Sequence, residues 1–316
     1  MSLKKMFTVT VIFCATIFIF GAKSFAAELE MVSYSAQVRL QWLANVGHPE
    51  AQKISKALGK IDIFGKQNLK DYDRIEKVNG IYQEINTAGL IDFVRKNDYR
   101  NIMDIGCGYS PRGVILARDG RKYIGAELNA IAISAMQIMP GIVGKEFAKN
   151  ISYEDVPVED REAMLGTAHQ FDGEICIVEH GLIQYLTMEK TDTMFTLVKE
   201  ILKKHGGCYI TLDFAKGNYF KEIAGAIYGY DQAQLIYEET GELYEELFGD
   251  AFYNSKFPSQ ADAVTFLNNH GLKVEMVPIL TDFSQLYCTK NLNAAQIEKL
   301  KDIAAKKYLW VITSAD

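Results

Sequence analysis

Two glycines followed by a single acid are the residues of this chain best suited to binding a nucleoside. Gly106 and Gly108 follow one apolar run, and Glu127 ends the next. Glycine adopts backbone angles denied to other residues and lets the backbone approach a ligand closely. A carboxylate such as Glu127 can accept hydrogen bonds from both hydroxyls of a ribose. The spacing therefore predicts a site with a glycine turn on one side and a sugar-binding acid on the other.

The residues around this trio have the order strand, turn, helix, strand. An apolar run at 102–105 indicates a first buried strand. Ser110 has an oxygen suited to a helix N-cap, and Pro111 suits the first helical position. Residues 123–126 then form a second strand that ends at Glu127. Both strands are expected to deliver the chemical residues to one edge of a sheet.

Two ligand chemistries use such a layout. A dinucleotide site has a third glycine three residues after the second, so that helix and strand pack closely over a pyrophosphate. Pro111 stands there instead, which disfavours an NAD-dependent oxidoreductase. S-adenosylmethionine (SAM) carries no phosphate and needs only the turn and the acid. The pattern therefore favours SAM, with Asp104, Gly106, Gly108 and Glu127 as predicted cofactor-binding residues.

A second segment places polar residues at the end of another strand. Residues 175–178 form an apolar run of the buried-strand type, and Glu179 and His180 follow it. Open α/β sheets bind ligands at the carboxyl ends of their strands. Glu179 and His180 are thus expected to lie beside the glycine turn.

Together the two segments resemble the leucine carboxyl methyltransferase family of class I SAM-dependent methyltransferases, which includes O-methyltransferases of polyketide biosynthesis. That family carries G-x-G-x-D-x-R and, later, E-G-x-x-x-Y-L. This chain has GCGYSPR at 106–112 and EHGLIQYL at 179–186, in the same order. Ser110 stands where the family has aspartate, and His180 is an insertion.

The resemblance implies roles for individual residues. Gly106 and Gly108 would line the methionine part of SAM, Glu127 would hold the ribose, and Glu179 with Tyr185 would border the transferred methyl.

Two further positions are carried over from the family. Arg112 matches its arginine and is a candidate partner for a carboxylate through paired N–H donors, the alternative being a solvated arginine. Asp155, with Asp160 as second choice, would meet the adenine amino group.

The chemistry of methyl transfer then suggests which residues act on the acceptor. A sulfonium methyl is already activated, so the protein mainly aligns the nucleophile and excludes water. A carboxylate acceptor needs no base, whereas a hydroxyl does, and His180 is the histidine in a suitable place. His180 and Tyr185 are therefore the predicted catalytic residues of an O-methyltransferase acting on a small molecule, with rim packing as the alternative for His180.

The wider pattern predicts an α/β fold: a Rossmann-like, doubly wound, seven-stranded sheet with its last strand antiparallel. The methyltransferase domain is expected over 101–290, ending in a hairpin of strands at 272–279 and 283–289. Helices over 27–100 would cover the cofactor.

Two additions complete the predicted organisation. An aromatic and acidic insertion at about 216–257 would form a helical lid over a partly apolar substrate, or simply the buried face of extra helices. Residues 291–316 would be an appended helix and an apolar tail.

The first 26 residues have the pattern of an export signal. Lys4 and Lys5 precede the uncharged run 7–22, and small residues follow at 24–26. The run is shorter than the ~20 residues that span a bilayer, so no stable membrane span is expected in the mature chain. A periplasmic or secreted protein is predicted, with a cytoplasmic or membrane-anchored chain as the alternative.

Charge and cysteine usage narrow the function further. The net charge is −6, and loss of the first 26 residues would make it more negative, which disfavours nucleic acid as a substrate. The cysteines show no metal-ligand spacing, so no metal site is predicted. Because SAM is made in the cytoplasm, an exported nucleoside-binding or SAM-binding protein with this fold but no catalysis is a further alternative.

Overall fold

A single mixed β-sheet organises the chain. The computed structural model describes residues 33–59, 71–214, 218–248, 257–279 and 282–315. The seven strands have the order β3-β2-β1-β4-β5-β7-β6, with β1 to β5 parallel and β7 antiparallel to both of its neighbours. This is the sheet expected of a class I methyltransferase, so the predicted fold class is confirmed. The strands are β1 Asn101–Ile105, β2 Lys122–Glu127, β3 Ile151–Asp155, β4 Ile175–Glu179, β5 Gly207–Thr211, β6 Leu272–Pro278 and β7 Tyr308–Ser314.

The central strands bury both faces, which explains their continuous apolar runs. Cys176 and Val178 of β4 pack into one core, and Ile175 and Ile177 pack into the other, as the alternation of side chains along a strand requires. On the first face lie a helix over residues 33–45 and helices α2 Pro49–Leu58, α4 Arg112–Arg118 and α5 Asn129–Val143. The second face is covered by α6 Arg161–Ala168, α7 Met188–His205 and α10 Gln260–Asn269.

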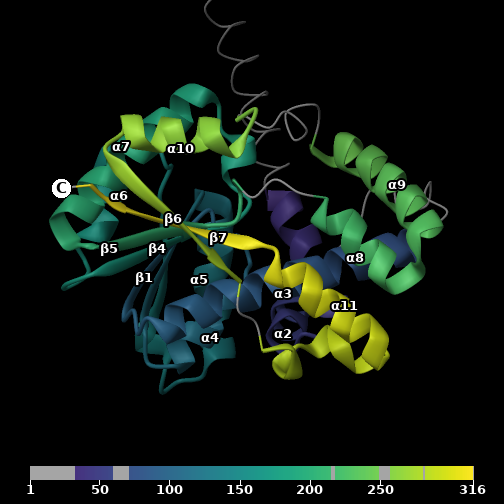
Figure 1. Ribbon diagram of the computed structural model, residues 1–316. Coiled ribbons are helices and arrows are strands. Elements are labelled where there is room, and N and C mark those ends of the chain that lie inside the picture. The colour runs from purple at the N-terminus through teal and green to yellow at the C-terminus, as the bar shows by residue number, and fades with distance from the viewer. Residues whose placement is uncertain (1–32, 60–70, 215–217, 249–256, 280–281, 316) are drawn as a thin grey trace, which may run out of the picture.

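A third cluster lies to one side of the sheet (Figure 1). There α3 Tyr72–Lys96 packs against α8 Tyr219–Tyr228 and α9 Tyr230–Phe248, and α11 Ala294–Ala305 packs against α8. Their shared interior is apolar and includes Ile81, Ile223, Ile236 and Leu300. Short 3₁₀ turns occur at Ala148–Asn150, Ile183–Tyr185, Phe283–Gln285 and Tyr287–Asn291.

The predicted terminal hairpin is wrong in its second strand. Residues 283–291 form 3₁₀ turns, and the C-terminal run 308–314, predicted to be an appended tail, enters the sheet as β7. A side chain of α3 engages part of this segment: the Glu84 carboxylate accepts hydrogen bonds from the N–H groups of Tyr287 and Cys288, each at 2.8 Å. Those two N–H groups are therefore unavailable to a neighbouring strand.

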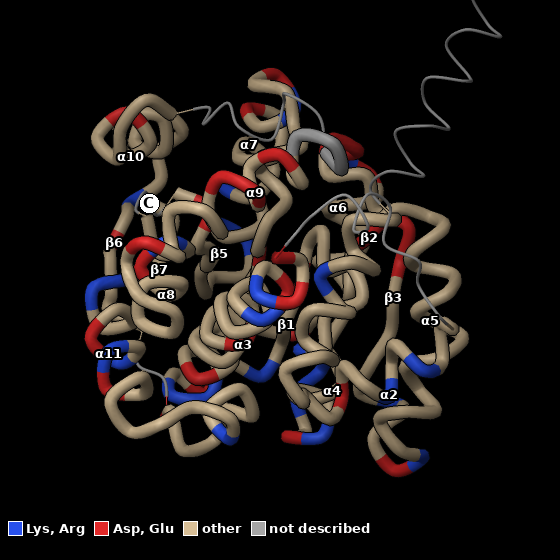
Figure 2. Tube along the Cα trace, turned by 90° about the vertical axis from the view of Figure 1, so that its right-hand side faces the viewer, with Lys and Arg blue, Asp and Glu red and all other residues tan. Residues whose placement is uncertain are grey.

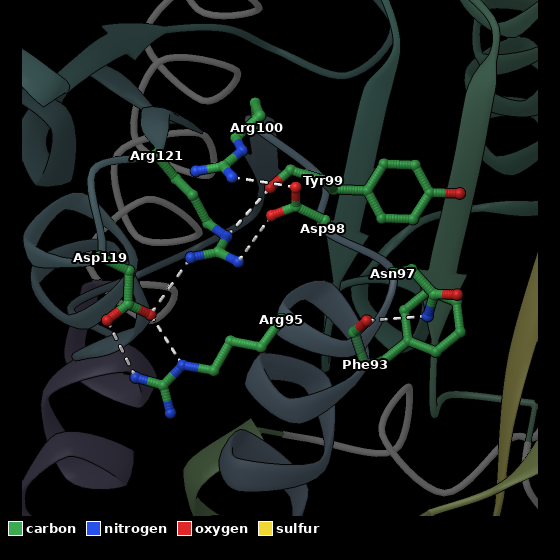
Figure 3. A network of polar contacts seen from close by, with 8 residues as sticks. All are labelled: Phe93, Arg95, Asn97, Asp98, Tyr99, Arg100, Asp119 and Arg121. Atoms are coloured by element: carbon green, nitrogen blue, oxygen red, sulfur yellow. Dashed lines mark hydrogen bonds and ion pairs between the residues drawn. The ribbon is translucent and has the colours of Figure 1, made fainter.

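At the amino ends of β1 and β2, a polar network ties the helices to the sheet (Figure 3). Arg95 of α3 donates to Asp119, which follows α4, at 2.7 and 3.2 Å. Arg121 donates from Nε to the carbonyl of Tyr99 at 3.0 Å and lies 3.5 Å from Asp119. Asp98, which has a φ of 52°, pairs with Arg100 at 2.9 Å. The network joins the turns that precede both strands.

Acidic and basic residues are interspersed along the outer helices (Figure 2). Within the described ranges, no helix is long and apolar enough to cross a membrane. The predicted export segment, residues 1–26, lies outside the described residues.

Candidate active site

A cavity of about 340 Å³ lies at the carboxyl ends of β1, β2 and β4, within the size range of small-molecule sites. Its lining includes the glycine turn, Glu127 and residues 156–159. It also includes residues of the 33–45 helix, of α3 and of the loop after β4, namely His180, Gly181, Leu182, Tyr185 and Leu186. The cavity therefore joins the two segments that the sequence singled out.

The glycine turn needs its glycines. Gly106 has a φ of 60° and Gly108 a φ of 54°, which side chains rarely adopt. A Cβ on Gly106 would stand 2.9 Å from the Cβ of Leu182, and one on Gly108 would stand 3.1 Å from the Cβ of Ala36. Both residues line the cavity, so the backbone itself forms this wall.

Four N–H groups of the turn are bonded within the chain. Gly106 donates to the carbonyl of Ala126 at 2.9 Å, and Gly108 donates to Glu127 Oε2 at 2.8 Å. Ser110 donates to the carbonyl of Cys107 at 3.1 Å. The N–H of Arg112, at the start of α4, donates to the hydroxyl of Ser110 at 3.3 Å. These four donors are thus not directed at a ligand, as they would be in a phosphate-binding turn.

Glu127 is the buried acid of the site. It is 6% exposed and lines the cavity. Oε2 accepts from Gly108 and Oε1 accepts from the N–H of Leu128, each at 2.8 Å. Burial raises the pKa of Glu127, and these two N–H groups oppose the rise. Each carboxylate oxygen has two lone pairs, so acceptor capacity remains for the two hydroxyls of a ribose.

Asp104 and Arg112 form a buried pair beneath the turn. Arg112 donates from Nε and Nη2 to the two oxygens of Asp104, each at 2.8 Å, and the Tyr123 hydroxyl donates to Asp104 at 2.8 Å. The paired N–H donors predicted for Arg112 thus engage a carboxylate of the chain itself. Arg112 lines the cavity, whereas Asp104 is fully buried and is not among the described lining residues.

The structure separates two other predicted acids from the cavity. Asp155 pairs in register with Glu127 but is exposed, and the lining residues begin after it, at Val156. Glu179 is fully buried and accepts from the Thr211 hydroxyl at 2.5 Å and from the N–H of Leu182 at 2.6 Å. Neither acid is among the described lining residues.

Glu179 instead supports the loop that lines the cavity, together with Asp213, which sequence reasoning missed. Asp213 accepts from the N–H groups of Gly181 at 2.8 Å and Ile183 at 3.3 Å. Burial and the neighbouring Asp213 raise the pKa of Glu179 well above its usual range. The available signal was an acid just beyond the end of a buried strand.

His180 and Tyr185, the predicted catalytic residues, both line the cavity. His180 Nε2 lies 3.2 Å from Asn86 Nδ2. Burial, with the positive charges of Arg112, Arg39 and Lys307, lowers the pKa of His180 well below its usual value. The imidazole is therefore neutral at neutral pH.

Arg39 is a second lining residue that sequence reasoning missed. Its Nη2 donates to the Tyr185 hydroxyl at 3.5 Å, and its guanidinium carbon lies 5.9 Å from the centroid of that ring. A Cβ on Gly181, which has a φ of 84°, would stand 1.9 Å from Arg39 Nη1. The available signal was a charge within the apolar repeat of Val38 and Trp42.

The predicted lid does not form this cavity in the part that the structure describes. None of the described residues in 216–257 lines it. Ile223 of α8 and Ile236 of α9 pack into the third cluster, while Tyr230 is 80% exposed. These two helices therefore match the simpler alternative from the sequence, in which the insertion forms the buried face of extra helices.

No protein-family model and no curated protein sequence matches the chain. Solved structures match in shape. The methyltransferase domain of bacterial CtHen1-C is 12% identical and covers 73% of this chain and 97% of its own, with a TM-score of 0.45. Magnesium protoporphyrin IX methyltransferase from Synechocystis PCC 6803 is 10% identical over 83% and 91%, with a TM-score of 0.46. Geranyl diphosphate C-methyltransferase from Streptomyces coelicolor A3(2) is 11% identical over 82% and 90%, with a TM-score of 0.39. Such distant likenesses carry no evidence of function, which has to come from the site.

Proposed function

We propose that the chain is a SAM-dependent methyltransferase that moves a methyl group to a carboxyl or hydroxyl oxygen of a small molecule. One observation carries the proposal: a glycine turn whose alternate N–H groups are bonded internally lies against the buried acid Glu127. Such a turn suits a nucleoside without phosphate, because it offers close backbone approach while these alternate N–H donors are already bonded.

The residues fit the parts of SAM in turn. Glu127 would accept the ribose hydroxyls, the backbone of Gly106 and Gly108 would lie against the methionine part, and Val156 with Val158 would supply an apolar wall for the base. Bound SAM would supply a methyl group already activated by a sulfonium. The chain would align the acceptor from Arg39 and the 180–186 loop and would exclude water.

The N–H inventory disfavours the oxidoreductase alternative. A pyrophosphate needs donors at the turn and at the helix N-terminus, and the Gly108 N–H is bonded to a carboxylate instead. A phosphate at that place would also face the negative charge of Glu127 at close range.

The cofactor is tested by calorimetric titration of SAM, S-adenosylhomocysteine and NAD into residues 27–316. In the Glu127→Ala variant the loss of two charge-assisted hydrogen bonds should weaken SAM binding on the order of 100-fold. Wild-type affinity should also fall as the pH falls through the raised pKa of Glu127, since the ionised form is the better acceptor.

Asp155→Ala is the matched control, because this acid pairs with Glu127 across neighbouring strands but is exposed. Asp155→Ala should leave the affinity for SAM unchanged. An equal loss of affinity in Asp155→Ala and Glu127→Ala would instead place Asp155 against the adenine. Binding of NAD without SAM would refute the proposal. SAM binding with no methyl transfer to any acceptor in a panel of carboxylic acids and phenols would favour the non-catalytic binding protein.

Export belongs to the same proposal and is supported by the pattern of residues 1–26. A mature chain that begins near residue 27 and is recovered outside the cytoplasm, as read by mass spectrometry, is the expected result. Recovery of the uncleaved chain in the cytoplasm would contradict export and would leave the SAM site untouched.

A further inference from the structure

Lys307 is a buried lysine that sequence reasoning did not connect with the site. It precedes β7, is 3% exposed, and lies with its ammonium 4.2 Å from the ring centroid of Tyr82 and 5.2 Å from that of Tyr219. Both rings lie within cation–π distance of the ammonium. Its Nζ donates to Asn86 Oδ1 of α3 at 2.6 Å, so the start of β7 is tied to α3 (Figure 1).

The Lys307 contact determines how the Asn86 amide is turned. An ammonium group has only donors, so the atom of Asn86 that faces it must be the oxygen. The amide nitrogen then points the other way, toward His180 Nε2 at 3.2 Å.

The orientation of Asn86 in turn determines the tautomer of His180. The Asn86 Nδ2 group is a donor, so His180 Nε2 must accept and carries no proton. A neutral imidazole has one proton, which therefore lies on Nδ1. In the described part of the chain, no residue makes a hydrogen bond to that nitrogen.

We propose that Lys307 is a positioning residue that acts through Asn86 to hold His180, which lines the cavity, as a hydrogen-bond donor with its proton on Nδ1. The proposal deepens the methyltransferase function and, in what it says of the acceptor, rests on it. It replaces the expectation that His180 is a base for a hydroxyl acceptor: Nε2 is engaged by Asn86 and Nδ1 already holds a proton.

A hydrogen-bond donor at His180 favours a methyl acceptor that is already negatively charged when it binds. Arg39 also lines the cavity and brings a positive charge beside the Tyr185 ring, with the Asp213 carboxylate near enough to interact with that charge. His180 and Arg39 together suit a carboxylate. A carboxylate oxygen would form the new C–O bond with its lone pair as the methyl–sulfur bond breaks and its electron pair stays on sulfur, so no proton has to be removed.

The tautomer is read directly by nitrogen NMR of the ¹⁵N-labelled protein without cofactor or acceptor. The two ring nitrogens of each histidine are correlated with the ring protons, and the His180 signals are assigned by their absence in His180→Gln. We expect a protonated-type Nδ1 and an unprotonated-type Nε2 at pH 7. An unprotonated-type Nδ1 would overturn the inference, whatever the outcome of SAM titration.

Two variants separate positioning from a structural role. Asn86→Asp has the same shape but cannot donate, so the His180 proton should move to Nε2 while Lys307 keeps a partner. Lys307→Met removes the ammonium and should yield a mixture of both tautomers. Lys306→Met alters the exposed neighbouring lysine and should leave the spectrum unchanged. Unchanged His180 signals in a folded Asn86→Asp protein would refute the role of Asn86.

The nature of the acceptor is tested with benzoate and its neutral counterpart benzyl alcohol as probes. Benzoate should shift the His180 Nδ1 signal in the wild type and should shift it less in Asn86→Asp. Benzyl alcohol should have little effect. A larger response to the alcohol would overturn the assignment to a carboxylate and would leave the cofactor titration unaffected.

Discussion

Two arginine–carboxylate groups lie at opposite ends of α4 and differ mainly in their exposure to water. At its start, Arg112 and Asp104 pair at 2.8 Å with side chains 4% and 0% exposed. After its end, Asp119 pairs with Arg95 at 2.7 Å, with side chains 26% and 45% exposed (Figure 3). The residue types and the contact distances are nearly the same, so any difference in consequence comes from burial.

Burial turns the first pair into a positional constraint. A buried charge without its partner is costly, so Arg112 and Asp104 hold one another, and with them the end of β1 and the start of α4. The glycine turn runs between these two points. The exposed pair is screened by water and salt, and Arg95, whose side chain is 45% exposed, keeps its solvation when Asp119 is lost.

The largest expected effect comes from breaking the buried pair. Asp104→Asn leaves the Arg112 guanidinium uncompensated and should lower the free energy of unfolding by about 3–5 kcal/mol, measured by urea denaturation. SAM affinity should fall as well, since the turn loses its anchor. A loss below about 1 kcal/mol would mean that burial does not distinguish the two groups.

An intermediate effect is expected from a substitution beside Arg39, which lines the cavity. Gly181→Ala forces a side chain into a left-handed backbone conformation and against Arg39 Nη1, so it should cost about 1–2 kcal/mol of stability. Benzoate binding should weaken while SAM binding is retained, because the added methyl group displaces Arg39 and not Glu127 or the glycine turn. Gly144→Ala is the matched control, since this glycine also has a positive φ but has no atom within 4 Å of an added Cβ. Equal loss of benzoate binding in both variants would exclude a direct effect on Arg39.

The smallest effect is expected from the exposed network. Asp119→Asn should lower the free energy of unfolding by less than about 1 kcal/mol, and the difference should shrink further at high salt. The same denaturation series measures it. A loss comparable with that of Asp104→Asn would show that Arg121, whose side chain is 8% exposed, behaves as a buried charge.

The sequence could predict those features that depend on residues close together along the chain. The glycine turn, the strands beside it and the acid at the end of β2 lie within one short stretch, and periodicity and cap residues define them locally. The strand at 308–314 was missed because apolar and polar residues are mixed in 283–289, as they can be in a strand. Residues 287 and 288 instead bond to Glu84, about 200 residues away along the chain, a contact that no local pattern reveals.

The contacts around His180 and Glu179 could not be predicted from the sequence for the same reason. The roles of Asn86 and Lys307 depend on a contact between residues 221 positions apart, and no local pattern marks either one. Glu179 was placed correctly at the end of a buried strand, but the direction of its side chain depends on Thr211 and Asp213 of the neighbouring segment.

The place of β7 in the sheet has a consequence for biosynthesis. Tyr308–Ser314 is the last of the described strands to leave the ribosome, yet it lies between β5 and β6, and Lys307 directly precedes it. A nascent chain that stops short of this point lacks both an inner strand and the residue that orients His180. Interrupted translation products would therefore present an open sheet edge to proteases and chaperones rather than a partly working site.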